Sequence, residues 1–285
     1  MAGLLSGLSS LGLGDLEDAK IYAEPKSEKS EDKNGIEQPE VKEKDLIYDR
    51  SFECPVCDAK LTSKVMKTGK SKFLHADTDL RMVYEGLDIQ KYDVITCPKC
   101  GFTALNRYFK PMTSMQVKLI KEKICKNVQI KPNTGDIYSY EEAMERYKLA
   151  LACAIVKQAK ASEKAYICLK SAWLLRGWQE ELSGLSENEN TDTINQLNAQ
   201  EMEYLSNAME GFITAMATEA YPICGMDEIT FEYLIAVLAL QFKKYDVSSK
   251  MIASILTSHA ANARMKDKAR DLKDALLVEL KKAKG

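Results

Sequence analysis

The chain has 285 residues, of which 45% are hydrophobic and 29% are charged, and its formal net charge is −2 at pH 7. A chain of this length forms one large or two ordinary domains, and the composition is that of a soluble globular protein. No window approaches the run of about eighteen apolar residues that spans a membrane, and collagen-like or wholly disordered chains are excluded as well. Eight cysteines are present, although a chain this long needs no disulfide scaffold for its stability.

Two segments precede the first structured part of the sequence. Residues 1–23 form a Leu-rich peptide that lacks the basic region of a secretion signal and runs into the acidic residues Asp15, Glu17 and Asp18. We therefore expect a cytoplasmic protein, whose thiols stay reduced and whose paired cysteines bind metal. Residues 24–46 are rich in Glu, Lys, Ser and Pro, which predicts a disordered charged linker.

Residues 47–135 contain short extended pieces and predict a small β-rich domain with a thin core. Thr68-Gly69-Lys70 is typical of a hairpin turn, and a helix is expected at about 114–126, after Pro111. Strand-like character is found in residues 64–67, 72–75 and 92–96.

The strongest motif is a pair of Cys-x-x-Cys sequences, Cys54-Pro-Val-Cys57 and Cys97-Pro-Lys-Cys100. Tetrahedral zinc takes four such ligands, and each turn presents two thiolates on one side of a tight loop. Gly101 supplies the positive φ that closes the second turn, whereas Asp58 stands at this position in the first turn, which is therefore strained or closed differently. We predict a zinc ribbon with the ligands Cys54, Cys57, Cys97 and Cys100.

The two pairs are separated by 39 residues, against about fifteen to twenty in compact zinc sites. This excess fits a strand pair inserted at about 64–84. His75 lies in the insertion as a further candidate ligand, but four cysteines suffice, so we interpret it as a strand residue. The other four cysteines stand singly and are interpreted as small buried residues. They are Cys125, Cys153, Cys168 and Cys224.

A site made of four cysteines has no open position for water or substrate, which indicates a structural zinc. Metal binding of this type contributes on the order of 10 kcal/mol to folding. Two alternatives stay open. Iron in a rubredoxin-like site needs an aromatic core around the metal, and redox-active cysteine pairs need a strand-to-helix setting.

From residue 136 to residue 285 the periodicity is helical and predicts an all-α domain, so the chain as a whole is expected to have an α+β fold. Ser139-Tyr-Glu-Glu142 is a capping box that begins the first helix. Tyr140-x2-Ala143-x3-Tyr147-x2-Ala150 resembles a tetratricopeptide helix, and Phe231-x2-Leu234-x3-Leu238 repeats the pattern weakly, which favours stacked helix pairs. Further helices are expected at about 161–182, 193–220, 227–244, 247–259 and 265–283.

The charge is unevenly distributed. Residues 50–131 carry 16 basic and 8 acidic side chains, whereas residues 1–49 carry 6 and 12 and residues 132–285 carry 18 and 22. A basic ribbon can follow a phosphate backbone, so a nucleic-acid-binding regulatory protein is the alternative function. Docking of the ribbon on acidic segments of the same chain or on a protein partner is the favoured explanation. The lysines concerned are Lys60, Lys64, Lys67, Lys70 and Lys72.

Catalytic motifs are absent from the sequence. It has two histidines, His75 and His259, and no His-Glu-x-x-His, Gly-x-Ser-x-Gly, phosphate-binding or dinucleotide-binding glycine motif. We therefore expect a protein without enzymatic activity. Its helical domain is predicted to act as a scaffold that binds unknown protein partners along a concave face.

Several short motifs follow one another in the sequence. They are Cys54-Pro-Val-Cys57, Asp77-x-Asp79, Tyr84-Glu-Gly-Leu, Tyr92-Asp-Val, Cys97-Pro-Lys-Cys100-Gly101 and Tyr140-Glu-Glu-Ala-Met-Glu-Arg-Tyr-Lys-Leu-Ala150. With these motifs the chain, from about Ser51 to its C-terminus, resembles the bacterial family called domain of unknown function 2225. The resemblance implies a cytoplasmic protein of Gram-positive anaerobe type and adds weight to the zinc assignment. That family has no established activity, so the resemblance implies no function.

Overall fold

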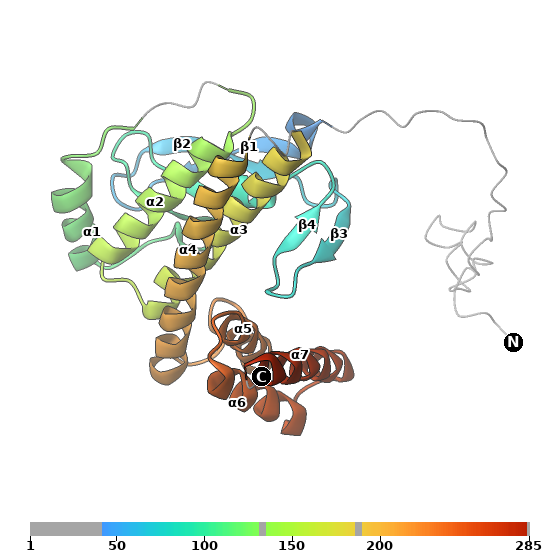
Figure 1. The fold of residues 1–285 in the computed structure, drawn as a ribbon. Helices are drawn as coiled ribbons and strands as arrows, with labels where there is room; N and C mark the ends of the chain where they lie inside the picture. Colours follow the sequence, from blue (N-terminus) through green and yellow to red (C-terminus); the bar gives the residue numbers. More distant parts are fainter. Residues whose placement is uncertain (1–41, 131–134, 186–189, 284–285) are drawn as a thin grey trace, which may run out of the picture. The chain divides into compact units, whose positions relative to one another are not determined.

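The computed structural model describes residues 42–130, 135–185 and 190–283. The described residues belong to one compact unit. The predicted Leu-rich peptide (1–23) and residues 24–41 of the predicted linker lie outside the described residues. In the compact unit, short strands come first and helices follow, which makes the fold α+β (Figure 1).

Six strands form three two-stranded antiparallel sheets within the described residues. The strands are β1 (Ile47–Glu53), β2 (Lys60–Met66), β3 (Phe73–Ala76), β4 (Met82–Tyr84), β5 (Val94–Thr96) and β6 (Thr103–Leu105). In the first sheet Glu53 lies opposite Lys60, and in the third Thr96 lies opposite Thr103. Each of these two hairpins therefore has its turn at a Cys-x-x-Cys pair.

The inserted strand pair is present, but it begins later than predicted. It consists of β3 and β4, whereas Lys64 belongs to β2, in which Leu61, Ser63 and Val65 are buried at alternate positions. Residues 68–70 do form a turn, with Gly69 at φ +77°, but this turn connects two sheets and not the strands of one hairpin. The prediction of a hairpin turn was wrong because the buried face of β2 sets its register with β1.

Ordered structure begins before residue 47. A short 3-10 helix, Glu43–Leu46, precedes β1 and buries Leu46. The Glu43 carboxylate accepts a hydrogen bond from the Tyr92 hydroxyl at 2.7 Å and pairs with the Lys91 ammonium at 2.7 Å. The last residues of the expected linker are part of the fold, because these two polar groups bind Glu43.

Seven α-helices lie in the described residues, at positions close to those predicted. They are α1 (Ser114–Ile120), α2 (Tyr140–Val156), α3 (Ala161–Leu185), α4 (Thr191–Thr218), α5 (Glu228–Gln241), α6 (Tyr245–Thr257) and α7 (Ala263–Lys282). α1 continues into a π-helical turn, η6 (Lys121–Cys125), which fills the expected range. The predicted capping box at Ser139 is confirmed, since its side chain and that of Glu142 bind each other's backbone N–H groups.

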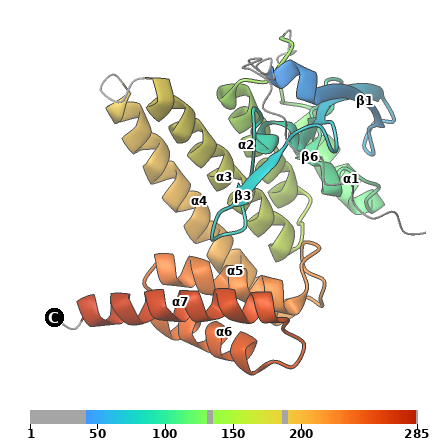
Figure 2. The same ribbon diagram turned by 90° about the vertical axis from the view of Figure 1, so that its right-hand side faces the viewer.

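The helices form two groups that meet at the end of α4. α2, α3 and α4 pack side by side, and α5, α6 and α7 form the second group (Figure 1 and Figure 2). Phe212 of α4 and Phe231 of α5 meet edge to face, with ring centroids 5.3 Å apart. α2 also packs against β5 and β6, where Val94 and Leu105 share a core with Tyr147. The β-rich and helical parts therefore pack as one unit.

Candidate functional site

The two Cys-x-x-Cys turns bring the four predicted ligands together. The turn of Cys54 and Cys57 joins β1 to β2, and the turn of Cys97 and Cys100 joins β5 to β6. All four Sγ atoms lie within 4.8 Å of one another, with 3.6 Å between Cys54 and Cys100 and 3.7 Å between Cys57 and Cys97. Zn–S bonds of about 2.3 Å in a tetrahedron place the sulfur atoms about 3.8 Å apart, so these positions fit a metal ion.

The two turns have the same hydrogen-bonding pattern. The Asp58 N–H donates to the Cys54 carbonyl at 2.9 Å, and the Gly101 N–H donates to the Cys97 carbonyl at 2.8 Å. The first thiol of each turn accepts hydrogen bonds from two backbone N–H groups. These belong to Val56 and Cys57 in the first turn and to Lys99 and Cys100 in the second. Such bonds orient and stabilise a metal-binding thiolate.

The residue that closes each turn adopts a left-handed conformation. φ is +57° at Asp58 and +74° at Gly101. The first turn therefore closes as the second does, because aspartate is one of the few residues with a Cβ atom that adopt this conformation at little cost. Gly101 is needed for a second reason, because a Cβ atom there would lie 2.2 Å from Cγ1 of Val128.

In the absence of a cation, the first thiol of each turn favours its protonated form. The neighbouring Cys100 thiol, followed by burial, raises the pKa of Cys54 far above its ordinary value. Burial likewise raises the pKa of Cys97. A divalent cation reverses this preference because it binds the thiolate form. The donor set, its spacing and its backbone hydrogen bonds therefore fit a bound metal ion.

A small core surrounds the four thiols and contains three phenylalanines. Phe102 is fully buried, with its ring centroid 5.4 Å from that of Phe109, which in turn meets Phe52 at 6.1 Å. These rings provide the aromatic surroundings that a rubredoxin-like iron site requires, so the surroundings do not distinguish iron from zinc. The setting needed by redox-active pairs is not found, since a strand and not a helix follows each pair.

The single cysteines are not all buried. Cys153 and Cys168 are buried as predicted, but Cys125 and Cys224 are half-buried, so the prediction was wrong for these two. Cys125 lies on η6 beside Cys100, in the core around the thiols. The four clustered cysteines are thus accompanied by a fifth one, which sequence spacing did not reveal.

An ionic cluster joins the inserted hairpin to the helices. Its members are Asp77, Asp79 and Arg81 from the hairpin, Arg176 and Glu180 from α3 and Glu201 from α4. The Trp173 indole N–H donates to the Asp79 carboxylate at 3.0 Å. Burial alone would raise the pKa of Asp77, but Arg81 and Arg176 outweigh it and hold this pKa below its ordinary value. The cluster positions β3 and β4 on the helices.

His75 lies at the exposed edge of this cluster. It is a β3 residue, as predicted, and its Nε2 atom lies 3.4 Å from the Asp77 carboxylate. The four-cysteine group does not include it. His75 therefore belongs to the surface of the inserted hairpin and not to the metal site.

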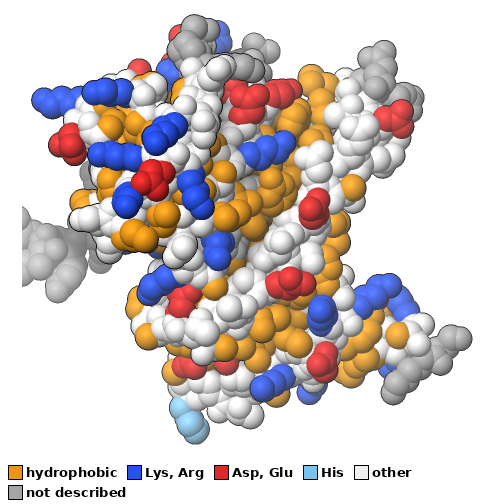
Figure 3. Space-filling view, turned by 90° about the vertical axis from the view of Figure 1, so that its left-hand side faces the viewer, with side chains coloured by type: hydrophobic (Ala, Val, Ile, Leu, Met, Phe, Trp, Pro, Cys, Tyr) orange, Lys and Arg blue, Asp and Glu red, His pale blue; other side chains and the backbone are white. Residues whose placement is uncertain are grey.

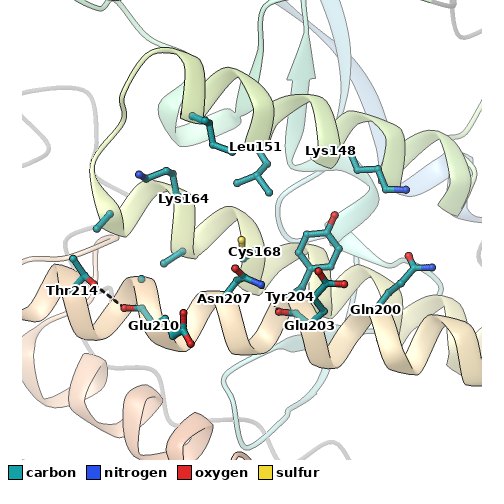
Figure 4. A pocket seen from close by; sticks show the side chains of 14 residues that line it. Lys148, Leu151, Lys164, Cys168, Gln200, Glu203, Tyr204, Asn207, Glu210 and Thr214 are labelled. Atoms are coloured by element: carbon teal, nitrogen blue, oxygen red, sulfur yellow. Dashed lines mark hydrogen bonds between the residues drawn. The ribbon is translucent and has the colours of Figure 1, made fainter.

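A groove of about 710 Å³ runs between α2 and α4, with α3 as its floor. Leu151, Ile155, Ala165 and Cys168 form its apolar part, and Ile155 is 58% exposed. Figure 4 shows a row of polar side chains along α4. The row consists of Gln200, Glu203, Asn207, Glu210 and Thr214. Hydrophobic side chains also gather in a furrow on this face of the molecule (Figure 3).

The five lysines predicted to form a basic face differ in whether they have a partner within the chain. Lys64 pairs with Asp49 at 3.5 Å, and the Lys67 ammonium donates to the Asp45 carbonyl at 2.9 Å. The other three, Lys60, Lys70 and Lys72, are exposed. Part of this positive charge is therefore bound within the ribbon itself.

Comparison of the sequence with models of known protein families gives one match. A model described as an uncharacterised protein conserved in bacteria, domain of unknown function 2225, matches residues 47–276. The chain belongs to this family. The resemblance found in the motifs is thereby confirmed. The span of the domain of unknown function 2225 includes the four cysteines, the ionic cluster and the groove.

Comparisons with curated proteins and with solved structures do not indicate an activity for the chain. No curated protein and no solved structure gives a significant match to the chain. In the part of the chain that the structure describes, no helix is both long and apolar enough to cross a bilayer. The function must therefore be inferred from the residues of this member of the domain of unknown function 2225.

Sequence reasoning missed the ionic cluster and the polar wall of the groove. Asp79 and Arg176 are 97 residues apart, and no periodicity links them. The motif Asp77-x-Asp79 was the only signal of the cluster. The wall on α4 reads in the sequence as an ordinary exposed helix face, because its partners across the groove are on α2 and α3.

Proposed function

We propose that this protein is a non-catalytic scaffold of the bacterial cytoplasm that binds a segment of a partner protein between α2 and α4. The observation that carries the proposal is the groove of about 710 Å³, which combines an exposed apolar side with a polar wall. Binding sites combine apolar contact area with a few polar groups that orient the partner. All eight cysteines are free, which suits the reducing cytoplasm.

The charges along the groove specify the kind of segment that it takes. Lys148 of α2 and Lys164 of α3 lie on one side, and Glu203 and Glu210 of α4 lie on the other (Figure 4). A segment with acidic groups along one edge, basic groups along the other and apolar side chains beneath complements all three surfaces. An amphipathic helix or an extended peptide satisfies this description.

The helical part is proposed to be a stack of helix pairs of tetratricopeptide-like type. The repeat-like positions of α2 are buried in one core together with residues of α3. They are Tyr140, Ala143, Tyr147 and Ala150. Phe231, Leu234 and Leu238 of α5 are buried in the same spacing. Stacking of such pairs leaves a concave face, which supports the groove as the partner site.

The chemistry of the groove supports binding and not catalysis. Its cysteine, Cys168, has its pKa raised to about 11 by burial, so it stays a thiol at neutral pH and is a poor nucleophile. His75 and His259 are both exposed, and neither lines the groove. The groove therefore contains no histidine to act as a general base.

The metal is proposed to be a structural zinc ion held by Cys54, Cys57, Cys97 and Cys100. Four thiolates fill its tetrahedral coordination and leave no position for a substrate. The ion links the β1–β2 hairpin to the β5–β6 hairpin, which packs on α2. Its role is therefore to hold the ribbon in place on the helices that form the groove.

The groove is tested with the variant Ile155→Glu, which places a charge on its apolar side at an exposed position. Peptides selected on the full chain from a displayed random library are expected to bind this variant at least about tenfold more weakly, a loss of about 1.4 kcal/mol. Leu277→Glu on α7, where Leu277 is 46% exposed, is the matched control and should bind as the wild type does. Equal affinity of Ile155→Glu and the wild type for every selected peptide would refute the proposal.

The zinc site is tested by elemental analysis of the purified chain. One zinc ion per chain is expected, and Cys54→Ser and Cys97→Ser should each lose it. Cys224→Ser is the control, because Cys224 lies outside the cluster and a serine can keep its hydrogen bond with the Tyr108 hydroxyl. One iron per chain would refute the identity of the metal, and a chain without metal would refute the site.

A further inference from the structure

One stretch of the chain is strongly and almost uniformly basic. Residues 97–130 contain seven basic side chains and a single acidic one, Glu122. The seven are Lys99, Arg107, Lys110, Lys118, Lys121, Lys123 and Lys126, and all of them are exposed. This stretch lies C-terminal to the five lysines that sequence analysis singled out, and it holds most of the excess positive charge of the ribbon.

Five of these lysines form one surface over α1, η6 and the second Cys-x-x-Cys turn. Ile120 and Ile124 face inward and pack in the core around the thiols, which turns the intervening lysines outward. Val128, just after η6, contacts Gly101 and so places η6 beside Lys99. Figure 3 shows Lys and Arg side chains gathered on the upper left of the molecule, where α1 faces the viewer. We call Lys99, Lys118, Lys121, Lys123 and Lys126 the α1 basic surface.

The charges of this surface are not neutralised within the chain. In the described residues its one ion pair joins Lys118 to Glu122 at 4.0 Å, with both side chains largely exposed. Several basic residues elsewhere are paired closely and buried. Lys157, for example, lies 2.7 Å from Glu163, and Lys170 lies 2.7 Å from Asp93. The structure therefore pairs its buried cations, whereas those of the α1 basic surface are exposed to solvent and available to a ligand.

We propose that the α1 basic surface binds the phosphate backbone of a nucleic acid. Several unpaired lysines within two helical turns suit a partner with closely and regularly spaced negative charges. An acidic protein partner would call for apolar anchors at the centre of the surface, and a membrane would call for apolar side chains that insert. The exposed large apolar residue on α1 is Met115, at its N-terminal end. Because lysine recognises phosphate as a point charge, the binding is independent of sequence.

This activity is separate from the proposed function, since the groove and the α1 basic surface share no residue. Together they allow one chain to bring a bound protein segment to a nucleic acid. A variant that loses one of the two activities should therefore keep the other. The peptide affinity of the groove variants and the nucleic-acid affinity of the surface variants can be measured on the same proteins.

The test is fluorescence anisotropy with the full zinc-loaded chain and labelled duplexes of about 20 base pairs of unrelated sequence. If four phosphates are neutralised, affinity should fall about 100-fold between roughly 50 and 200 mM salt. All duplex sequences should bind with the same affinity within a factor of about 3. Polyglutamate of equal charge and vesicles that contain anionic lipid are run as competitors.

The surface variant carries Lys118→Gln, Lys121→Gln, Lys123→Gln and Lys126→Gln together. Its matched control removes the same charge from α6 and α7, through Lys250→Gln, Arg264→Gln, Lys273→Gln and Lys281→Gln, all at exposed positions. A third variant replaces the four surface lysines by arginine. Zinc content and circular dichroism confirm that each variant is folded.

We expect the surface variant to lose at least about tenfold in affinity at low salt and most of its salt dependence, whereas the control and the arginine variant bind as the wild type does. Absence of duplex binding by the wild type at low salt would overturn the proposal. Equal losses in the surface variant and the control would do so as well. Competition by polyglutamate or by vesicles as effective as that by duplex would assign the surface to an acidic protein or a membrane instead.

Discussion

Arg176 is the residue through which the ionic cluster can be tested most directly. Its guanidinium lies 3.0 Å from the Asp77 carboxylate, 2.8 Å from that of Asp79 and 2.8 Å from that of Glu201. The carboxylates of Asp79 and Glu201 are only 5% and 7% exposed. The substitution Arg176→Met keeps the aliphatic volume but leaves these two buried charges without their main partner.

The loss of stability expected for Arg176→Met follows from the burial of these two carboxylates. Removing one partner of a buried ion pair destabilises a protein by about 3–5 kcal/mol, because an uncompensated charge stays in the interior. In a unit of this size each kcal/mol shifts Tm by about 2–4 °C, so Arg176→Met should lower Tm by about 10 °C. By contrast, an exposed pair contributes about 0–1 kcal/mol.

The assay is thermal unfolding of the purified chain, followed by circular dichroism. Arg270→Met is the matched control, since Arg270 pairs with Asp267 on the surface of α7 with both side chains mostly exposed. It should change Tm by no more than about 3 °C. If Arg176→Met and Arg270→Met melt within about 2 °C of each other, the cluster does not hold the hairpin on the helices and the reasoning fails.

Three further predictions concern single positions. Gly101→Ala should lower the free energy of unfolding in urea by about 3 kcal/mol, because it combines a left-handed φ with a clash against Val128. Asp58→Gly, at the same position of the other turn, should change the free energy of unfolding by less than about 1 kcal/mol. Equal effects of the two substitutions would contradict this account. The pKa of Asp77 is lowered in the folded state, so its contribution to stability is present above the unfolded pKa of about 3.9 and is lost as pH falls through the folded pKa. Between about pH 6 and pH 3, the Tm of Asp77→Asn should therefore fall by less than the Tm of the wild type. An equal fall in both proteins would rule this out. Burial raises the pKa of Asp88, so its ionisation lowers the stability of the folded chain as pH rises, the opposite of the effect at Asp77. The Tm of Asp88→Asn relative to the wild type should therefore increase between about pH 4 and pH 8. A decrease would show that the charge of Asp88 is favourable in the folded state.

The sequence was a good guide wherever neighbouring residues decide the structure. The first turn of α2 is an example, because Ser139 and Glu142 satisfy each other's backbone groups within four residues. The clustered cysteines are another example, since each tight turn contributes two of the four thiols and its own residues determine how it closes. Asp58 shows the limit of such reasoning, as its left-handed conformation follows from the same hydrogen bond that closes the glycine turn.

Which of the basic side chains are paired and which are free depends on contacts that composition does not reveal. Counting charges predicted a basic ribbon, but it placed the free surface at Lys60 to Lys72. Lys64 and Lys67 instead find partners within the chain, whereas Lys60, Lys70 and Lys72 are exposed. A second group of exposed lysines lies on α1, η6 and the second Cys-x-x-Cys turn. A net charge reports how many cations a segment carries, whereas their availability depends on which carboxylates the fold brings near them.

By itself, the sequence determined the family, the α+β order of elements, most helix boundaries and the four cysteines that cluster, because each depends on interactions between residues close in the chain. Only the tertiary structure decided that β3 and β4 are anchored by the ionic cluster, that Cys125 lies beside Cys100 and that α2 and α4 form a groove over α3. These features join residues far apart in the sequence. Their energies come from burial and pairing, which exist only once the chain has folded.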